Sequence, residues 1–423
     1  MYYFKGLMFV LMLNIILGAG AQGLSIPVAG FPLTIMDIFL FLGLFRMFSR
    51  VARNKALLLR KDDAMITILA LIALFRAVIN IFTNGLSAIR DCTHYMDMLF
   101  IPVLYFELIE AETRIDLVAY LREWFIKTKD CVFFYSLLLP FRPILIRISP
   151  KGFGAQSAIP ILGSFTITHL WLLVIVMVNS YIVSKGMVRG KRRNWYIIQS
   201  VISMVLMVYT SSRITMLTML VFLLISMWHN QANIFYRIMK YVLIGALAML
   251  ILAMLGITIE TSRGTFSISN LFDMFMSIFG DESAGYDGAS LRRGFFSTVI
   301  ESHSSIDRVL FGGGFGYPLI SFGAATGANV REPHCSYLSV YARNGVIFLS
   351  FWFSYLLGKL KLARNNMNNN TYCYILFVVL VSCLMNATCE TFFETPCEAS
   401  VFYGLVAICS YMIVFHEESA EAI

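Results

Sequence analysis

The sequence predicts an all-α, polytopic integral membrane protein with about twelve transmembrane helices and one long loop outside the membrane. Hydrophobic residues make up 58% of the 423 residues, and charged residues only 14%, against about 25% in soluble domains. The mean hydropathy is +0.75, and one soluble core could not bury that much Phe, Leu, Ile and Met. Twelve spans of about 20 residues each would use about 240 residues and leave room for one sizeable loop.

Apolar runs that could cross a bilayer recur along the whole chain. The predicted spans are 5–22, 28–48, 64–83, 93–110, 129–147, 158–183, 195–210, 212–228, 238–257, 337–358, 371–389 and 397–415. The fourth and fifth are the weakest, because Asp97 and Glu107 interrupt one and Pro140 lies inside the other. Between these two, the stretch 112–127 is amphipathic, which predicts a helix lying on the membrane surface.

Basic residues predict the orientation of the spans. Lys and Arg concentrate in the even-numbered connections, whereas the short odd-numbered connections carry far fewer: none at 23–27, Arg90 at 84–92 and none at 390–396. Because positive charge marks the cytoplasmic side, we expect both termini in the cytoplasm and the long loop outside. The net charge of +8 then reflects orientation, not nucleic-acid binding. The chain divides into residues 1–257 (spans one to nine), 258–336 (the outer loop) and 337–423 (spans ten to twelve and a short tail).

The N-terminus has two interpretations. Lys5, an apolar run and AGA at 19–21 resemble a signal peptide. We prefer a retained first span, because a multispan protein needs no cleaved signal. Cleavage would not change the orientation of the remaining spans.

No cofactor or metal site is expected. The eight Cys are scattered without CxxC or Cys/His spacing. Most of them lie in or beside apolar runs, where Cys behaves as a small hydrophobic residue.

Three arginines are candidate binding sites for an anion. Arg213 follows a very short connection, YTSSR at 209–213, which places it at the outer rim of the bilayer. It either snorkels to the lipid headgroups or faces an anionic substrate. Arg292 and Arg293 lie near the start of a predicted outer-loop helix, where they oppose the helix dipole. A phosphate would offset this cost, although the two side chains could equally be a solvated pair.

A glycine-rich segment follows at 312–327. Gly312, Gly314 and Gly316 belong to neither a P-loop nor a Rossmann fingerprint, because no GKS or GKT follows and Tyr317 stands where a third Gly belongs. The segment is either a flexible loop or backbone brought close to a ligand.

His334 is the candidate general base. Pro333 favours the start of a helix, which would put His334 in the first turn, at the mouth of the tenth span. A neutral imidazole with an ordinary pKa near 6.5 suits this role, although such a His is more often a cap or surface residue.

Other titratable groups are less decisive. His94 and Asp97 lie in or beside the fourth span. Glu390, Glu394 and Glu398 occupy the last outer connection, where Glu390 is a candidate for orienting the His or contacting a sugar hydroxyl. A solvated rim is the preferred interpretation of the three Glu.

The order of these features resembles the O-antigen polymerase and ligase superfamily (Wzy-type polymerases and WaaL-type ligases). It has S-R at an outer rim, an Arg-bearing loop helix, G-x-G-F-G, then P-H-x-S-Y-L before a span with R-N-G-V-I-F. The resemblance covers about 200–360. Cys335 stands where the family often has Asn, and Phe295 or Phe296 where it often has Trp. These departures leave the choice between Arg292 and Arg293 open.

The resemblance implies a GT-C-like membrane glycosyltransferase, independent of divalent metal. It would act at the periplasmic face of the bacterial inner membrane on undecaprenyl-pyrophosphate-linked oligosaccharide. The outer loop contains no D-x-D. A chain-length regulator and a flippase are implied partners. We favour a polymerase over a ligase, because the sequence diverges strongly outside the shared motifs. A transporter or flippase is the third alternative, which the concentration of polar residues at the outer face disfavours.

The charge asymmetry gives a direct test of topology. Reporters fused near Lys191 and Asn368 should report a cytoplasmic location, and those near Asp281 and Pro396 a periplasmic one. A cytoplasmic signal at Asp281 would place the outer loop in the wrong compartment and contradict the predicted site.

Overall fold

The computed structural model describes residues 1–28, 31–52, 59–150, 160–165, 167–210, 212–228, 232–254, 260–261, 264–265, 288–321, 329–330, 333–368 and 370–415. The helices are α1 (Tyr2–Leu17), η1 (Gly18–Gly23), α2 (Ile35–Val51), α3 (Lys61–Asn84), α4 (Ser87–Met96), η2 (Asp97–Leu99), α5 (Phe100–Glu112), α6 (Leu117–Ser136), η3 (Leu139–Phe141), α7 (Arg142–Ile148), α8 (Thr168–Ser184), α9 (Gly190–Thr210), α10 (Arg213–Trp228), α11 (Ala232–Met254), α13 (Gly288–Ser302), α14 (Ile306–Phe311), α15 (Ser336–Asn366), α16 (Thr371–Ala387) and α17 (Pro396–Phe415), where η marks a 3-10 helix. The described strands pair antiparallel: β1 (Ser25–Val28) with β2 (Phe31–Thr34), β3 (Glu260–Thr261) with β4 (Gly264–Thr265), and β5 (Ile320–Ser321) with β6 (Asn329–Val330).

The predicted all-α fold is confirmed, and several of the described helices are apolar enough to cross a membrane. Four described helices are long and apolar enough to cross a membrane: Tyr2–Gly23, Lys61–Asn84, Ser336–Asn366 and Cys397–Phe415. A fifth candidate is the pair Leu117–Ser136 and Leu139–Ile148, bent by 44°. Three further apolar helices are shorter: Thr168–Ser184, Ile214–Met227 and Thr371–Ala387. Within the described ranges, twelve spans are therefore not reached.

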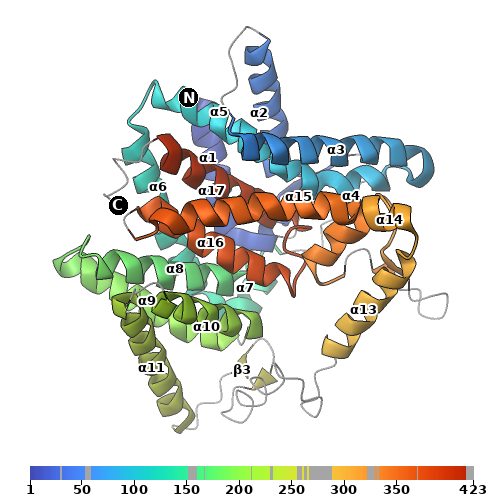
Figure 1. The fold of residues 1–423 in the computed structure, drawn as a ribbon. Helices are drawn as coiled ribbons and strands as arrows, with labels where there is room; N and C mark the ends of the chain where they lie inside the picture. Colours follow the sequence, from blue (N-terminus) through green and yellow to red (C-terminus); the bar gives the residue numbers. More distant parts are fainter. Residues whose placement is uncertain are drawn as a thin grey trace.

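Helices α16 and α17 form the centre of the bundle. Nearly all of their side chains are buried, including Tyr374 and Phe402, as expected for helices that are apolar on every side. Helix α17 packs against α1 and α5, and α16 packs against α8, α10 and α15. In Figure 1, α3 and α15 run side by side, with the α3–α4 turn and α14 at the right and the α8–α9 turn at the left.

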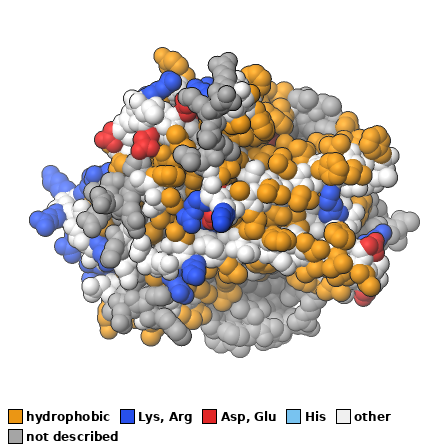
Figure 2. All heavy atoms as spheres, turned by 45° about the horizontal axis from the view of Figure 1, so that its top comes forward, with side chains coloured by type: hydrophobic (Ala, Val, Ile, Leu, Met, Phe, Trp, Pro, Cys, Tyr) orange, Lys and Arg blue, Asp and Glu red, His pale blue; other side chains and the backbone are white. Residues whose placement is uncertain are grey.

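The outward face of α3 is strongly apolar. Phe75 is 67% exposed and Phe82 is 89% exposed, which a soluble protein would avoid over so large a patch. Figure 2 shows a broad hydrophobic surface on one face of the molecule; Lys and Arg are most numerous at its left end, and a few lie near its centre and toward its right. This distribution is the one expected where lipid chains cover the side of a bundle and headgroups meet its end.

The second predicted span begins later than expected. Strands β1 and β2 pair where this span was expected to begin, with Pro27 opposite Pro32, and proline lacks the N–H that a helix interior needs. Helix α2 starts only after Thr34. There the Thr34 Oγ1 accepts from the Asp37 N–H at 3.2 Å, and Asp37 Oδ2 accepts from the Thr34 N–H at 2.8 Å. This capping box satisfies two free donors at the helix start.

The fourth predicted span and the predicted surface helix also differ from what the sequence led us to expect. The fourth is divided at Asp97, where α4 ends and η2 leads into α5. The expectation that 112–127 forms a helix on the membrane surface is wrong, because most of this stretch is the first half of α6. Its Leu121 and Trp124 are buried, and the Trp124 indole N–H donates to the Met8 carbonyl oxygen at 2.8 Å. The apolar face of the stretch therefore meets α1 instead of headgroups.

Helix α15 is kinked at Gly345, which has φ 78° and ψ 178°. A Cβ at this position would lie 2.2 Å from the Leu310 carbonyl oxygen, so a larger residue would push α14 away from α15. The kink also frees carbonyl groups that a regular helix would use. Those of Ala342 and Arg343 accept from the N–H groups of Gly313 and Gly314, at 2.7 Å and 3.0 Å.

The glycine-rich segment is thus packed against helices over its described part. Gly312, with φ 72°, lies so close to α15 that a Cβ would be 2.5 Å from the Arg343 carbonyl carbon. Gly314 and Gly316 lie against Asn80 and Asn84 of α3. A flexible loop is therefore excluded for residues 312–317, and the close approach of their backbone is to helices of the same chain.

A buried ion pair holds the segment 312–317 against the neighbouring helices. Arg343 Nη2 lies 3.2 Å from Asp91 Oδ2, and both side chains are 2% exposed. The same carboxylate oxygen accepts from the Gly316 N–H at 3.0 Å, and Arg343 Nη1 donates to the Tyr317 carbonyl oxygen at 2.8 Å. The pair therefore joins α4, α15 and the segment 312–317 in one place.

Removing one member of this pair should destabilise the fold. Arg343→Met leaves the Asp91 carboxylate buried without its main partner, which typically costs about 3–5 kcal/mol. Arg90→Met is the matched control. Arg90 lies 3.1 Å from the same carboxylate group but is 37% exposed, so its loss should cost about 1 kcal/mol or less. Unfolding in detergent followed by circular dichroism measures the difference; equal losses would contradict the anchoring role.

Candidate functional site

His334 lies just before α15, on a turn whose other members are buried. The helix begins at Ser336 with Cys335 as its N-cap, three residues after the predicted start at Pro333, so His334 is not in the first helical turn. Pro333 and Cys335 are buried, whereas His334 is exposed. The imidazole is consequently the side chain of this turn that a ligand can reach.

The structure brings His334 against the outer-loop helix α13. The ring centroids of His334 and Phe295 are 6.4 Å apart and the rings are stacked at 24°. Phe295 and Val299 are buried together with Leu338 of α15. Helix α13 therefore packs on the outer part of α15 through these two residues.

Polar contacts fix the end of α13. His303 is buried, and its Nε2 lies 2.9 Å from the Ala342 carbonyl oxygen, while its Nδ1 lies 2.8 Å from the Val299 carbonyl oxygen. Both ring nitrogens are thus used within the protein. His303 lies between the end of α13 and the start of α14.

The three candidate arginines are placed only by their backbone. Arg292 and Arg293 belong to α13, the helix that contacts His334, and Arg213 is the first residue of α10. Their side chains lie outside what the structure describes. The short connection between α9 and α10 is where the sequence predicted it, and α10 packs against α8 and α16.

The last outer connection differs from a solvated rim. Glu398 is buried at 6% exposure in α17, and Glu394 is half-buried with its Oε2 2.5 Å from Ser336 Oγ. Glu390, which the sequence singled out, reaches Ser336 through its backbone carbonyl oxygen at 3.2 Å. Glu394 is therefore the carboxylate that contacts the start of α15.

A further polar contact joins α8 to the end of α16. Asn386 Nδ2 lies 3.3 Å from His169 Nε2. Neither residue stands in a recognisable motif, and 217 positions separate them, so sequence reasoning gave no signal for this pair.

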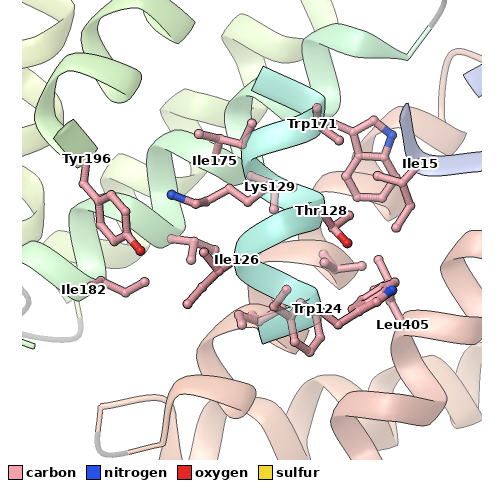
Figure 3. A pocket seen from close by; sticks show the side chains of 16 residues that line it. Ile15, Trp124, Ile126, Thr128, Lys129, Trp171, Ile175, Ile182, Tyr196 and Leu405 are labelled. Atoms are coloured by element: carbon pink, nitrogen blue, oxygen red, sulfur yellow. The ribbon is translucent and has the colours of Figure 1, made fainter. Parts of the chain in front are cut away.

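An apolar pocket lies elsewhere in the bundle (Figure 3), between α6, α8, α9 and α16. Trp124 and Ile175 line it, and none of the predicted site residues does. Its Lys129 is already engaged by the protein: Nζ donates to Asn179 Oδ1 at 3.1 Å and to Gln199 Oε1 at 2.7 Å. The pocket is therefore separate from the outer end where His334 lies.

Comparison with known proteins assigns no family. No protein-family model matches the chain, and no curated protein matches it. The functional argument consequently depends on the residues and on their arrangement.

Proposed function

We propose that the chain is a membrane glycosyltransferase, a polymerase of O-antigen or a related surface polysaccharide. It would move a glycan from undecaprenyl pyrophosphate onto another lipid-linked repeat unit at the periplasmic face of the inner membrane. The observation that carries the proposal is the contact of the exposed His334 with α13, the helix that bears Arg292 and Arg293. The candidate base thus lies against Phe295 of the helix whose backbone also carries the candidate phosphate-binding residues.

The proposed reaction is a direct, inverting displacement. Arg213 and one of Arg292 and Arg293 bind the donor pyrophosphate and stabilise the charge that develops as the bond between sugar and phosphate breaks. His334 accepts the proton of the acceptor hydroxyl as its oxygen attacks the anomeric carbon. The products are the lengthened glycan and undecaprenyl pyrophosphate. The step requires no covalent enzyme intermediate and no divalent metal.

Rigid packing around His334 favours this role. The turn 333–335 leads directly into α15, and α13 covers the outer part of that helix through Phe295 and Val299. A base has to stay within hydrogen-bond reach of the attacking hydroxyl, and a side chain on a fixed element meets this need better than one on a mobile loop.

A ligase that transfers the glycan to lipid A core is the second candidate, because both reactions need the same donor contacts. A deletion strain tells them apart. Loss of a polymerase leaves one repeat unit on the core, and loss of a ligase leaves polymer on the lipid carrier. A normal glycan pattern would contradict both, whereas unpolymerised repeat units left on the lipid carrier, with none on the core, would favour a flippase or transporter.

Complementation of that strain tests the base. His334→Ala should reduce product formation by about 10²–10⁴, with membrane abundance unchanged. A variant that keeps more than about a tenth of wild-type turnover would remove His334 from the mechanism.

Arg213 can be tested by a charge-conserving change. Lys keeps the charge but cannot make two parallel hydrogen bonds from one plane. If Arg213 binds pyrophosphate, Arg213→Lys should lose most activity and Arg213→Ala nearly all. If Arg213 only snorkels, Lys should serve almost as well. Polymer length and amount are measured at matched membrane abundance, and full polymer in the Lys variant would rule out the bidentate role.

A further inference from the structure

Ser336, the first residue of α15, joins the turn that carries His334 to the connection between α16 and α17. Its Oγ lies 2.5 Å from Glu394 Oε2 and accepts from the Phe393 N–H at 3.1 Å. The Glu390 carbonyl oxygen is 3.2 Å from the same hydroxyl. Because a hydroxyl group has one proton, the shorter contact takes it when Glu394 is ionised.

Either protonation state of Glu394 can maintain this contact. The ionised carboxylate accepts from Ser336, while a protonated carboxyl group donates to Ser336 Oγ and leaves the hydroxyl proton for the Glu390 carbonyl oxygen. Burial raises the pKa of Glu394 to about 7, and the hydroxyl groups of Ser336 and Ser339 lower it. Both states are therefore populated near neutral pH.

The surroundings of Glu394 make this contact its main polar interaction. Its second oxygen, Oε1, is buried and has no hydrogen-bond partner among the described residues. The carboxyl group borders a small cavity that His94, Trp352 and Tyr403 also line. Burying a carboxyl group is costly unless hydrogen bonds compensate, so the hydroxyl groups of α15, first among them Ser336 at 2.5 Å, make this placement possible.

We propose that Glu394 is a positioning residue that acts through Ser336 to fix the turn 333–335 and the direction of the His334 imidazole. The inference rests on the proposed role of His334 as the base. Pro333 and Cys335 on either side of His334 are buried. Because both neighbours are buried, the position of this turn relative to the connection between α16 and α17 sets the direction of the exposed ring.

Cys335 offers a readout of this contact that does not depend on glycan transfer. Its side chain is 5% exposed, and burial raises the pKa of its thiol. A hydrophilic maleimide should label it slowly while the turn is held. Cys131 is exposed and Cys389 partly exposed, so both are replaced by Ser. Purified full-length protein in lipid nanodiscs is then labelled at one fixed pH.

The variants distinguish loss of the hydrogen bond between Glu394 and Ser336 from loss of a carboxylate charge. The maleimide should label Cys335 about tenfold faster in Glu394→Ala and in Ser336→Ala, because each substitution removes a hydrogen bond that holds the turn. Glu394→Gln should label like the parent, since its amide group can still accept from Ser336. Glu390→Ala is the matched control: it removes a carboxylate from the same connection but keeps the backbone carbonyl group that Ser336 contacts. Unchanged labelling in Glu394→Ala, or equal acceleration in Glu390→Ala, would overturn the proposal.

Product formation supplies the second arm. Glu394→Ala should lower kcat with little change in the KM for the donor, and Glu394→Gln should restore most of the rate. If Glu394→Ala labels fast but keeps full kcat while His334→Ala is inactive, the positioning role is wrong and the glycosyl-transfer proposal stands. If His334→Ala is fully active, the proposed function fails, whatever Cys335 shows, and the positioning role in catalysis fails with it.

Discussion

The buried ion pair of Arg343 with Asp91 is the contact on which the outer half of this fold depends. Charges removed from water are costly unless close partners compensate for lost hydration. Here the compensation comes from a 3.2 Å pair and from backbone groups of Gly316 and Tyr317. These backbone groups can reach the pair only if the segment 312–317 lies flat on α3, α4 and α15. The cost of the buried charges therefore specifies one position for this segment.

The position of that segment determines what covers the outer part of α15. Gly313 and Gly314 bind the carbonyl groups freed by the Gly345 kink, and the chain then enters β5. Ile320 of β5 packs with Phe295 and Val299 of α13 against α15. The helix that contacts His334 is thus held by a series of contacts that begins at a charge pair.

A second buried cluster holds the other end of α15. Lys359 Nζ lies 2.7 Å from Asp63 Oδ1 and 3.1 Å from Asp62 Oδ2, with the Lys359 side chain fully buried. Arg343 and Lys359 therefore tie α15 to α3 and α4 at two separated points. Ion pairs in a low-dielectric surrounding are strong and directional, so α15 is a rigid support from which the turn at 333–335 projects.

The sequence by itself determined the structural class of the protein and the positions of several helix starts and connections. Its composition predicted an all-α membrane protein, and its local patterns located the short α9–α10 connection, the outer-loop helix that bears Arg292 and Arg293, and the helix that follows Pro333. These features depend on residues that are close together in the chain, so the local pattern of residue types can predict them. Only the tertiary structure decided that Arg343 meets Asp91, that the glycine-rich segment packs on helices, and that Glu394 instead of Glu390 contacts Ser336. Such pairs join residues far apart in the chain, and a single sequence carries no periodic signal for them because they arise from the packing of distant elements.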